Sequence, residues 1–287
     1  MSPVQQYAIE NSLPQLIWPD VGGERCKYDV GVVDSFGHLI PDNVINMFTY
    51  GLLNIHPSLL PRWRGAAPLY HTILSGDEET GVTIIQISPQ FDVGPIVMQT
   101  TITVPHRCTT IQLSKILSQL GSNMLLQVLD DLPRKIENSV VQPTNGVTLA
   151  KKIKTDMSWI DWCNYSCRFI DRLHRAISTH VTLRTLWRGK LLKLYNMVDL
   201  HVTQGLQLPL ADVHPGVVKY HNKHGILCIR CLDGWVGFKS VTIERRKKMS
   251  AKDFYNGFLS RDQSLDWNNF TSVRNKHTEA LNKKYGT

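Results

Sequence analysis

The sequence predicts an α/β domain followed by a small β-barrel domain, and three observations support this prediction. Between residues 27 and 132, short runs rich in β-branched residues alternate with segments of helical periodicity, as in parallel α/β sheets. The segment QPTNGVTLAKKIKTD (142–156) then interrupts the periodicity with Pro, Asn and Gly, as domain boundaries do. Beyond residue 190, short strand-like runs follow one another between turn residues, a pattern typical of a small barrel or sandwich.

Residues 1–142 are expected to form the first domain. Strands are predicted at 27–37, 52–55 and 81–87, because these runs are rich in Val and Ile and such runs form buried strands. A helix is predicted over 109–132, where a Thr able to cap precedes apolar residues at helical spacing. We therefore expect a parallel sheet accompanied by helices.

The second half is expected to open with a linker and the start of a C-terminal domain over 143–205, including a helix at about 165–178. Residues 206–287 are expected to form a basic β-barrel with a C-terminal tail. The strand-like runs of this half are KLLKLYNMVDL, HPGVVKYH, HGILCIRCLDGW and VGFKSVTI. Turn residues join these short strands, which favours a small closed or sandwiched sheet over a helical domain.

Composition excludes several classes of protein. With 287 residues, 42% of them hydrophobic, the chain is expected to be a globular protein large enough for two domains. No run approaches the roughly 18 apolar residues of a membrane span, and MSPVQQYAIENSLPQ has neither a signal-peptide core nor an Arg-rich presequence. Six irregularly spaced cysteines favour a reducing compartment over a disulfide framework.

The pair Cys228-Ile-Arg-Cys231 raises the question of a metal site. A zinc knuckle needs a turn between its cysteines, whereas GILCIRCL is expected to be a strand whose two sulfurs point to opposite faces. No metal is therefore expected there.

Charge divides the chain unevenly. Residues 1–142 hold 8 Lys and Arg against 13 Asp and Glu, and residues 143–287 hold 24 against 11. The two halves therefore carry about −5 and +13. Such a basic half is expected to meet a polyanion, most simply nucleic acid, although part of any charge excess is ordinary solvated surface.

Three polar residues form the candidate catalytic site. In LLNIHP, alternation places Asn54 and His56 on one face of a strand that ends at Pro57. Asp92 lies in a Pro- and Gly-bounded loop after the strand GVTIIQI, so it is expected at the same carboxyl edge. A carboxylate would favour protonated His56, and the Asn amide could stabilise an oxyanion.

This set of groups suits acyl transfer without a covalent enzyme intermediate, since no G-x-S-x-G, P-loop or HExxH motif is present. The alternative is a histidine capped by an asparagine in an ordinary polar loop, and spacing alone does not decide between the two.

LLNIHPSLLPRWRGAAP, followed by GDEETGVTIIQI and FDVGP, resembles the catalytic region of folate-dependent formyltransferases. The resemblance implies a Rossmann-like domain that transfers formyl from 10-formyltetrahydrofolate to an amine without a metal. It assigns catalysis to Asn54, His56 and Asp92: the first two stabilise the tetrahedral oxyanion, and Asp92 orients His56 and assists proton transfer. It also implies folate contacts, mainly through the backbone, for which the candidates are Phe36, His38, Ile40, Ser58, Leu59, Leu60 and Pro61.

SLLPRWRGAAP with DGWVGFKSVTI and AKDFYNGFL resembles the members of this family that formylate methionyl-tRNA. In these members a C-terminal OB-like barrel holds tRNA, so initiator methionyl-tRNA is the expected acceptor, for translation initiation. The residues expected to contact tRNA are Arg62, Arg64, Lys151, Lys152, Arg172, Arg175, Arg245 and Arg246.

WPDVG and DFYNGF are similar to segments of the mitochondrial enzymes of animals, which implies a place in the mitochondrial matrix. Family members begin earlier, so the resemblance implies a chain truncated at its amino end, without the opening strands of the catalytic domain. Two alternatives stay open: a catalytically impaired tRNA-binding isoform, and a formyltransferase or hydrolase acting on a small amine or on water. Neither a membrane nor an obligate protein partner is expected.

Overall fold

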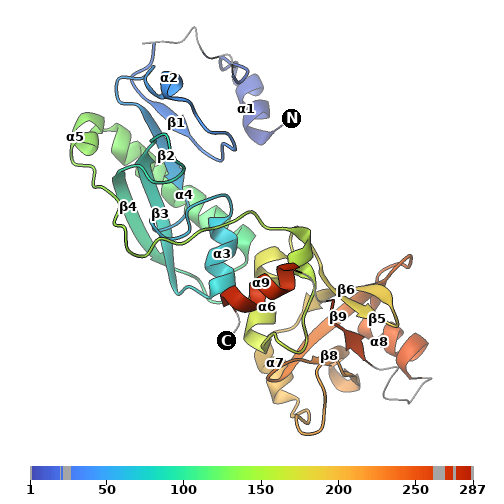
Figure 1. The fold of residues 1–287 in the computed structure, drawn as a ribbon. Helices are drawn as coiled ribbons and strands as arrows, with labels where there is room; N and C mark the ends of the chain where they lie inside the picture. The colour runs from blue at the N-terminus through green and yellow to red at the C-terminus, as the bar shows by residue number, and fades with distance from the viewer. Residues whose placement is uncertain (1, 20, 22–26, 261–268, 274–275, 286–287) are drawn as a thin grey trace. The chain divides into compact units, whose positions relative to one another are not determined.

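The computed structural model describes residues 2–19, 21, 27–260, 269–273 and 276–285, and it divides into two compact units (Figure 1). Unit 1 comprises Met1–Arg64, Gly81–Thr100 and Gln119–Thr148. Unit 2 comprises Gly65–Thr80, Thr101–Ser118 and Leu149–Thr287. The chain therefore passes between the units several times, and each unit is assembled from segments far apart in sequence.

Unit 1 is built on a four-stranded sheet in the order β1-β2-β3-β4. Its strands are β1 (Gly31–Val33), β2 (Leu52–His56), β3 (Glu79–Gln86) and β4 (Ile96–Thr103). β1 runs parallel to β2, whereas β3 runs antiparallel to it, with Asn54 opposite Ile85 and His56 opposite Thr83. The sheet is mixed, so the expectation of a purely parallel sheet is wrong.

The reason lies in the connection between β2 and β3. Two neighbouring parallel strands need a crossover segment, usually a helix that packs back on their own sheet. The helix between these strands, α3 (Pro68–Ser75), packs instead against α6 (Cys167–Ile177) of unit 2. The chain consequently re-enters the sheet in the opposite direction.

Burial explains why β2 and β3 were recognisable as strands. Leu53, Val82, Ile84 and Ile85 are at most 1% exposed, as expected for strands covered on both faces. The predicted helix at 109–132 is confirmed as α4 (Thr110–Leu129). Gly121 of α4 lies so close to the sheet that a Cβ there would stand 2.9 Å from the Ile55 side chain, so a larger residue would push the helix away.

Three further helices belong to unit 1: α1 (Pro3–Glu10), α2 (Asp42–Ile45) and α5 (Leu132–Glu137). The α1 helix begins with a Ser2 side chain that accepts a hydrogen bond from the Gln5 amide at 3.2 Å, followed by a proline in the first turn, which is a favourable start for a helix. Across the described residues, none of the helices has the length and apolar character required to cross a membrane.

Unit 2 contains a second sheet in the order β11-β5-β6-β9-β8-β7, with β10 paired to β9. Its antiparallel strands are β5 (Leu183–Trp187), β6 (Lys190–Met197), β7 (Val218–His221), β8 (Ile226–Arg230), β9 (Trp235–Ile243), β10 (Met249–Ser250) and β11 (Phe270–Thr271). Over the described residues this sheet is an open path, and a single bridge between Val217 and Asn269 links the segments at its two ends.

The predicted helix at about 165–178 is confirmed as α6, and its sequence explains both its start and its burial. Ser166 accepts a hydrogen bond from the Phe169 amide at 3.2 Å at the N-cap. Phe169, Ile170, Leu173 and Ile177 recur at helical spacing and are at most 2% exposed, so one face of α6 lies in the core. The described residues of unit 2 also form the α-helices α7 (Leu200–Gly205), α8 (Ala251–Phe254) and α9 (Lys276–Tyr285). They further include two short 3-10 helices, Thr155–Ser158 and Asn222–His224, and a π-helical segment, Tyr255–Leu259.

Candidate active site

His56 ends strand β2 and is held rigidly. It is 5% exposed, and its Nε2 lies 3.0 Å from the Trp63 carbonyl oxygen. Because a carbonyl can only accept, this contact places a proton on Nε2 and leaves Nδ1 as the basic nitrogen of the neutral ring. Nδ1 faces the Asp92 carboxylate, 3.7 Å from Oδ1.

Burial lowers the pKa of His56 below its ordinary value, while the Asp92 carboxylate and the Trp63 carbonyl raise it and offset part of that effect. The ring is therefore biased toward its neutral form, with an anionic neighbour that stabilises a proton arriving on Nδ1. This is the behaviour expected of a general base that becomes a general acid during the reaction.

Asp92 reaches His56 by a different route from the one predicted. Because β3 is antiparallel to β2, its last residue, Gln86, lies opposite Leu53 rather than beside His56. The loop 87–95 then turns back, and the Gln86 amide donates to the Pro95 carbonyl at 3.0 Å. Gly94 makes this closure possible, since a Cβ there would lie 1.7 Å from the Gln86 carbonyl oxygen.

Two backbone conformations beside His56 are unusual. Asp92 has φ +54° and Trp63 has φ +62°, in the left-handed region that side-chain-bearing residues rarely adopt. Such conformations cost of order 1–3 kcal/mol each and persist where the surrounding structure fixes them, often at functional sites. Both residues contact His56, one through its carboxylate and one through its carbonyl.

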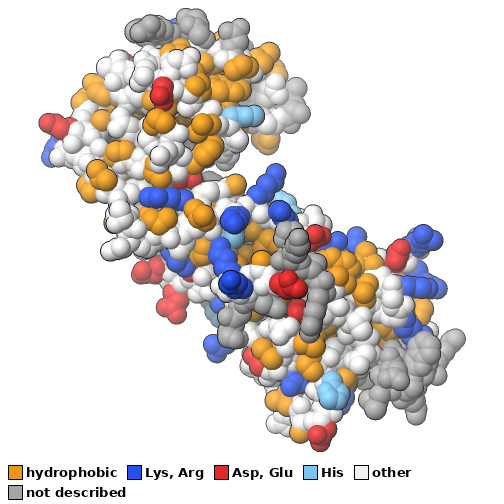
Figure 2. Space-filling view, viewed as in Figure 1, with side chains coloured by type: hydrophobic (Ala, Val, Ile, Leu, Met, Phe, Trp, Pro, Cys, Tyr) orange, Lys and Arg blue, Asp and Glu red, His pale blue; other side chains and the backbone are white. Residues whose placement is uncertain are grey.

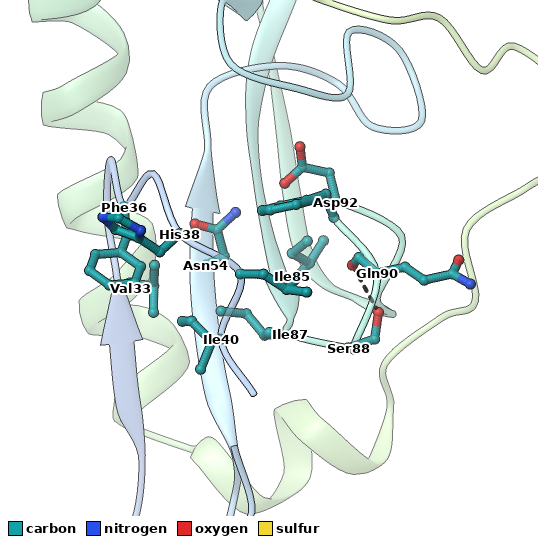
Figure 3. A pocket seen from close by; sticks show the side chains of 12 residues that line it. Val33, Phe36, His38, Ile40, Asn54, Ile85, Ile87, Ser88, Gln90 and Asp92 are labelled. Atoms are coloured by element: carbon teal, nitrogen blue, oxygen red, sulfur yellow. Dashed lines mark hydrogen bonds between the residues drawn. The ribbon is translucent and has the colours of Figure 1, made fainter. Parts of the chain in front are cut away.

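Asn54 and Asp92 line a common cavity of about 70 Å³ in unit 1. Figure 3 shows Asn54 on its strand between the segment that carries Phe36 and His38 and the loop that carries Asp92. The apolar lining consists of Val33, Phe36, Leu39, Ile40, Ile85, Ile87 and Phe91. Typical small-molecule sites enclose roughly 300–1,000 Å³, so this cavity encloses only part of a folate-sized ligand.

Gln142 holds the loop that carries Asp92 in place, and no sequence pattern indicates this role. Its buried side-chain amide donates to the carbonyls of Asp92 at 2.9 Å and Gly94 at 2.8 Å. Its Oε1 accepts two hydrogen bonds from the Arg64 guanidinium, at 3.1 and 2.6 Å. Gln142 thus links the Asp92 loop to Arg64. In the sequence it is marked only by the proline that follows it, and a residue before a proline is not a sign of a catalytic site.

Replacement of Gln142 by Glu should lower kcat roughly 10- to 100-fold, because the carboxylate keeps Arg64 but repels the Asp92 and Gly94 carbonyls, and small displacements at a reacting centre are costly. Steady-state turnover would measure the loss, with Gln119→Glu as the control. Gln119 is an exposed residue of α4, and its side-chain amide donates to Asn123 at 3.2 Å. Equal kcat values for the two variants would contradict a positioning role for Gln142.

The structure places the seven candidate folate residues in two groups. Phe36, His38 and Ile40 line the cavity with Asn54 and Asp92. The remaining four follow His56 in a turn that does not line this cavity: Ser58, Leu59, Leu60 and Pro61. In that turn the Leu60 amide donates to the Thr83 hydroxyl at 3.1 Å, and the Thr83 hydroxyl donates to the Ser58 carbonyl at 2.6 Å, so the turn is anchored on β3.

The eight candidate tRNA residues also fall into two groups. Four are half-buried and have guanidinium groups that contact partners inside their own unit: Arg62, Arg64, Arg172 and Arg175. Arg172 donates to the Ser75 carbonyl at 2.8 Å, and Arg175 contacts the Asp171 carboxylate at 2.8 Å, so both help to fix α6. The other four are exposed: Lys151, Lys152, Arg245 and Arg246.

Comparisons with known proteins identify the class of fold. Residues 21–129 match the family described as Formyl transferase, and residues 152–259 match Formyl transferase, C-terminal domain. The crystal structure of WlaRD, a sugar 3N-formyl transferase, is similar with a TM-score of 0.58 and 17% identity over 85% of this chain and 82% of that chain. The crystal structure of HypX from Aquifex aeolicus is similar with a TM-score of 0.58 and 18% identity, over 83% of this chain and 40% of that chain. Both parts of the chain therefore have a formyltransferase fold.

Sequence relatives narrow the class. The chain is 34% identical to the methionyl-tRNA formyltransferase of Methylococcus capsulatus, over 89% of this chain and 82% of that protein. It is 47% identical to the mitochondrial methionyl-tRNA formyltransferases of Mus musculus and Homo sapiens over 90% of its length. The chain belongs to the methionyl-tRNA formyltransferase family. It spans 66% of the length of these mitochondrial relatives.

Proposed function

We propose that this chain transfers the formyl group of 10-formyltetrahydrofolate to the amino group of initiator methionyl-tRNA in the mitochondrial matrix. The observation that carries the proposal is the convergence of Asn54, His56 and Asp92 in a member of the methionyl-tRNA formyltransferase family. The similarity to mitochondrial relatives supports the proposed compartment. No metal is needed, because the trio supplies the oxyanion donor and the proton acceptor itself.

The reaction begins when the methionyl amino nitrogen attacks the formyl carbon, and the carbonyl oxygen becomes an oxyanion. The Asn54 amide, which lines the cavity, donates a hydrogen bond to that oxyanion. The attacking nitrogen must lose a proton, and the Asp92 carboxylate lies in the same cavity to accept it. The bond from the formyl carbon to N10 of the folate then breaks, and N10 takes up a proton.

His56 assists this proton transfer. Its Nδ1, 3.7 Å from Asp92, shares the proton taken from the amine, and the resulting positive ring stabilises the oxyanion beside Asn54. The Trp63 carbonyl holds the ring in orientation throughout, because the Nε2 hydrogen bond forms with either protonation state. The same proton can then return to N10 as the folate leaves, so no proton is lost or gained overall.

The apolar walls formed by Phe36, Ile40, Ile85 and Ile87 suit the flat ring of a folate. Since the cavity encloses only part of such a ligand, the formyl group and the adjacent ring edge are the parts we place there. His38 lies beside Phe36, with ring centroids 5.4 Å apart, and closes the same side of the cavity.

The tRNA is proposed to bind through the basic second half, with the sheet of unit 2 acting as the OB-like domain. Figure 2 shows lysine and arginine side chains gathered over the region of unit 2 that includes the ends of β6 and β9. Arg245 follows β9, and its side chain is 91% exposed. Exposed cations of this kind hold phosphates without reading base sequence.

Binding of methionyl-tRNA should weaken as salt rises, and replacing a phosphate-contacting cation should lower the steepness of that dependence by about one. We expect this of Arg245→Ala. The control is Arg134→Ala in unit 1, which removes the same charge from a side chain that is 78% exposed. The affinity of each variant for methionyl-tRNA would be measured from 50 to 300 mM KCl. Equal slopes of log affinity against log salt concentration for the two variants would show that Arg245 does not contact tRNA phosphates.

A comparison of acceptors tests the proposed function. The chain is supplied with 10-formyltetrahydrofolate and either methionyl-tRNA, free methionine or uncharged tRNA, and tetrahydrofolate release is followed. We expect release that depends on methionyl-tRNA. Equal release with methionine or with no acceptor would instead indicate a small-amine transferase or a hydrolase.

A further inference from the structure

Two cysteines distant in sequence meet inside unit 2, and neither belongs to the candidate active site of unit 1. Cys167 opens helix α6, and Cys231 lies directly after strand β8. Their sulfurs are 3.2 Å apart, although 64 positions separate them in the chain. The CxxC pair noted in the sequence is therefore divided: Cys231 faces Cys167, whereas Cys228 lies in a core cluster with Val198 and Ile226.

The surroundings hold the two sulfurs together. The turn after β8 is tied to the start of α6 by two hydrogen bonds: the Asp233 carboxylate accepts from the Cys167 amide at 2.7 Å, and the Leu232 amide donates to the Tyr165 carbonyl at 3.2 Å. Gly234 leaves room for the Cys167 sulfur, since a Cβ there would lie 2.8 Å from it. The approach is therefore a fixed feature of two packed backbone segments.

A metal ion fits this geometry less well than a bond between the sulfurs. With Asp233, the two cysteines offer three possible ligand atoms within 4.8 Å of one another. A tetrahedral ion about 2.3 Å from each sulfur would hold the sulfurs roughly 3.8 Å apart, wider than the 3.2 Å observed. The Asp233 Oδ1 is moreover already engaged with the Cys167 amide.

We propose that Cys167 and Cys231 are a covalent modification site that closes into an intramolecular disulfide when the chain meets a peroxide. Cys167 is reached first, because it lines a cavity of about 820 Å³ and is 9% exposed, whereas Cys231 is fully buried. Hydrogen peroxide converts the Cys167 thiol to a sulfenic acid and releases water. The Cys231 sulfur then attacks Cys167 and releases a second water, so two thiols are oxidised and one peroxide is reduced.

Oxidation of Cys167 by peroxide is slow at neutral pH, so the pair does not act as a rapid redox sensor. The hydrogen bond between the two sulfurs, together with burial, raises the pKa of the Cys167 thiol, and thiolates are the reactive form. Oxidation should therefore proceed over hours and accelerate with rising pH. Once formed, the bond joins α6 to the turn before β9 and should raise the melting temperature by roughly 5–10 °C.

Peptide mapping tests the proposal on the folded chain. The chain is incubated with hydrogen peroxide, remaining thiols are alkylated, and the unreduced protein is digested with trypsin. Cleavage after Arg230 separates Cys228 from Cys231, so the expected cross-link joins peptide 231–239 to peptide 155–168. Because peptide 155–168 also contains Cys163, the experiment is repeated with Cys163→Ser, in which the cross-link should persist, and with Cys167→Ala, in which it should vanish.

Two outcomes would overturn the proposal. One is recovery of both peptides without a cross-link, or a cross-link through Cys163 or Cys228, after prolonged oxidation of the native chain. The other is metal binding: if the reduced chain retains one equivalent of added Zn²⁺ through desalting and Cys167→Ala does not, the pair is a zinc site. Dithiothreitol should reverse the cross-link and the shift in melting temperature together.

Discussion

Replacement of His56 by Ala should lower kcat/KM for formyl transfer by about 10²- to 10⁴-fold, the usual contribution of a positioned acid-base group. The loss has a defined cause. The His56 ring contacts both the Trp63 carbonyl, through Nε2, and the Asp92 carboxylate, through Nδ1. Without this ring, the proton of the attacking amine is no longer shared between Asp92 and an imidazole, and the positive charge of the protonated ring no longer stabilises the oxyanion. Quenched-flow or steady-state assays of formyl-methionyl-tRNA would measure the loss.

His71→Ala is the matched control. His71 is also a buried histidine, 3% exposed, and burial lowers its pKa to about 4. It lies in unit 2, where Nε2 donates to the Lys151 carbonyl at 2.8 Å and Nδ1 contacts the Tyr285 hydroxyl. Assayed below its unfolding transition, this variant should lose stability but keep kcat. A similar fall in kcat for both variants would show that the loss reflects a missing buried ring rather than catalysis.

Replacement of Asp92 by Asn should lower kcat by roughly 10²-fold or more and should also change the titration of His56. The Asp92 carboxylate raises the pKa of His56, although burial is the larger effect and lowers it. Removing the negative charge leaves burial less opposed, so the pKa of His56 should fall further. The ring of the variant should therefore hold its proton only at lower pH than in the parent chain.

Nitrogen-15 NMR of the imidazole rings would follow this directly, with His56→Ala used to identify the signal. In the parent chain the midpoint should lie below the ordinary value of 6.5, and in Asp92→Asn it should lie lower still. A midpoint that does not move, or that rises, would mean that Asp92 does not act on His56 electrostatically. Such a result would leave only a direct role of Asp92 toward substrate.

Much of this architecture could be read from local pattern. The apolar runs in β2 and β3 and the helical spacing in α4 and α6 identified those elements, because burial imposes the patterns directly. The direction of β3 relative to β2 could not be predicted, because a strand buried on both faces has the same residue pattern in a parallel and in an antiparallel pair. β4 (Ile96–Thr103) escaped notice because polar residues occupy its exposed face.

In the candidate site, too, some features could be predicted from local pattern and others depend on the packing of distant segments. Asn54 and His56 could be chosen because alternation placed them on one face of a strand that ends at a proline. The groups that hold His56 and Asp92 in place could not be identified from the sequence. The Trp63 carbonyl is a backbone group with no sequence signature, and Gln142 reaches the Asp92 loop across 50 positions of chain. Such contacts depend on how distant segments pack.

Formation of formyl-methionyl-tRNA by the purified chain, measured beside His56→Ala and Asp92→Asn, is the most direct test of the central claim. Product is quantified by mass spectrometry of the released amino acid, with 10-formyltetrahydrofolate as donor. We predict formylmethionine from the parent chain and less than about 1% of that rate from either variant. No formylmethionine from the parent chain, or equal yields from all three proteins, would contradict the proposed activity and the site assigned to it.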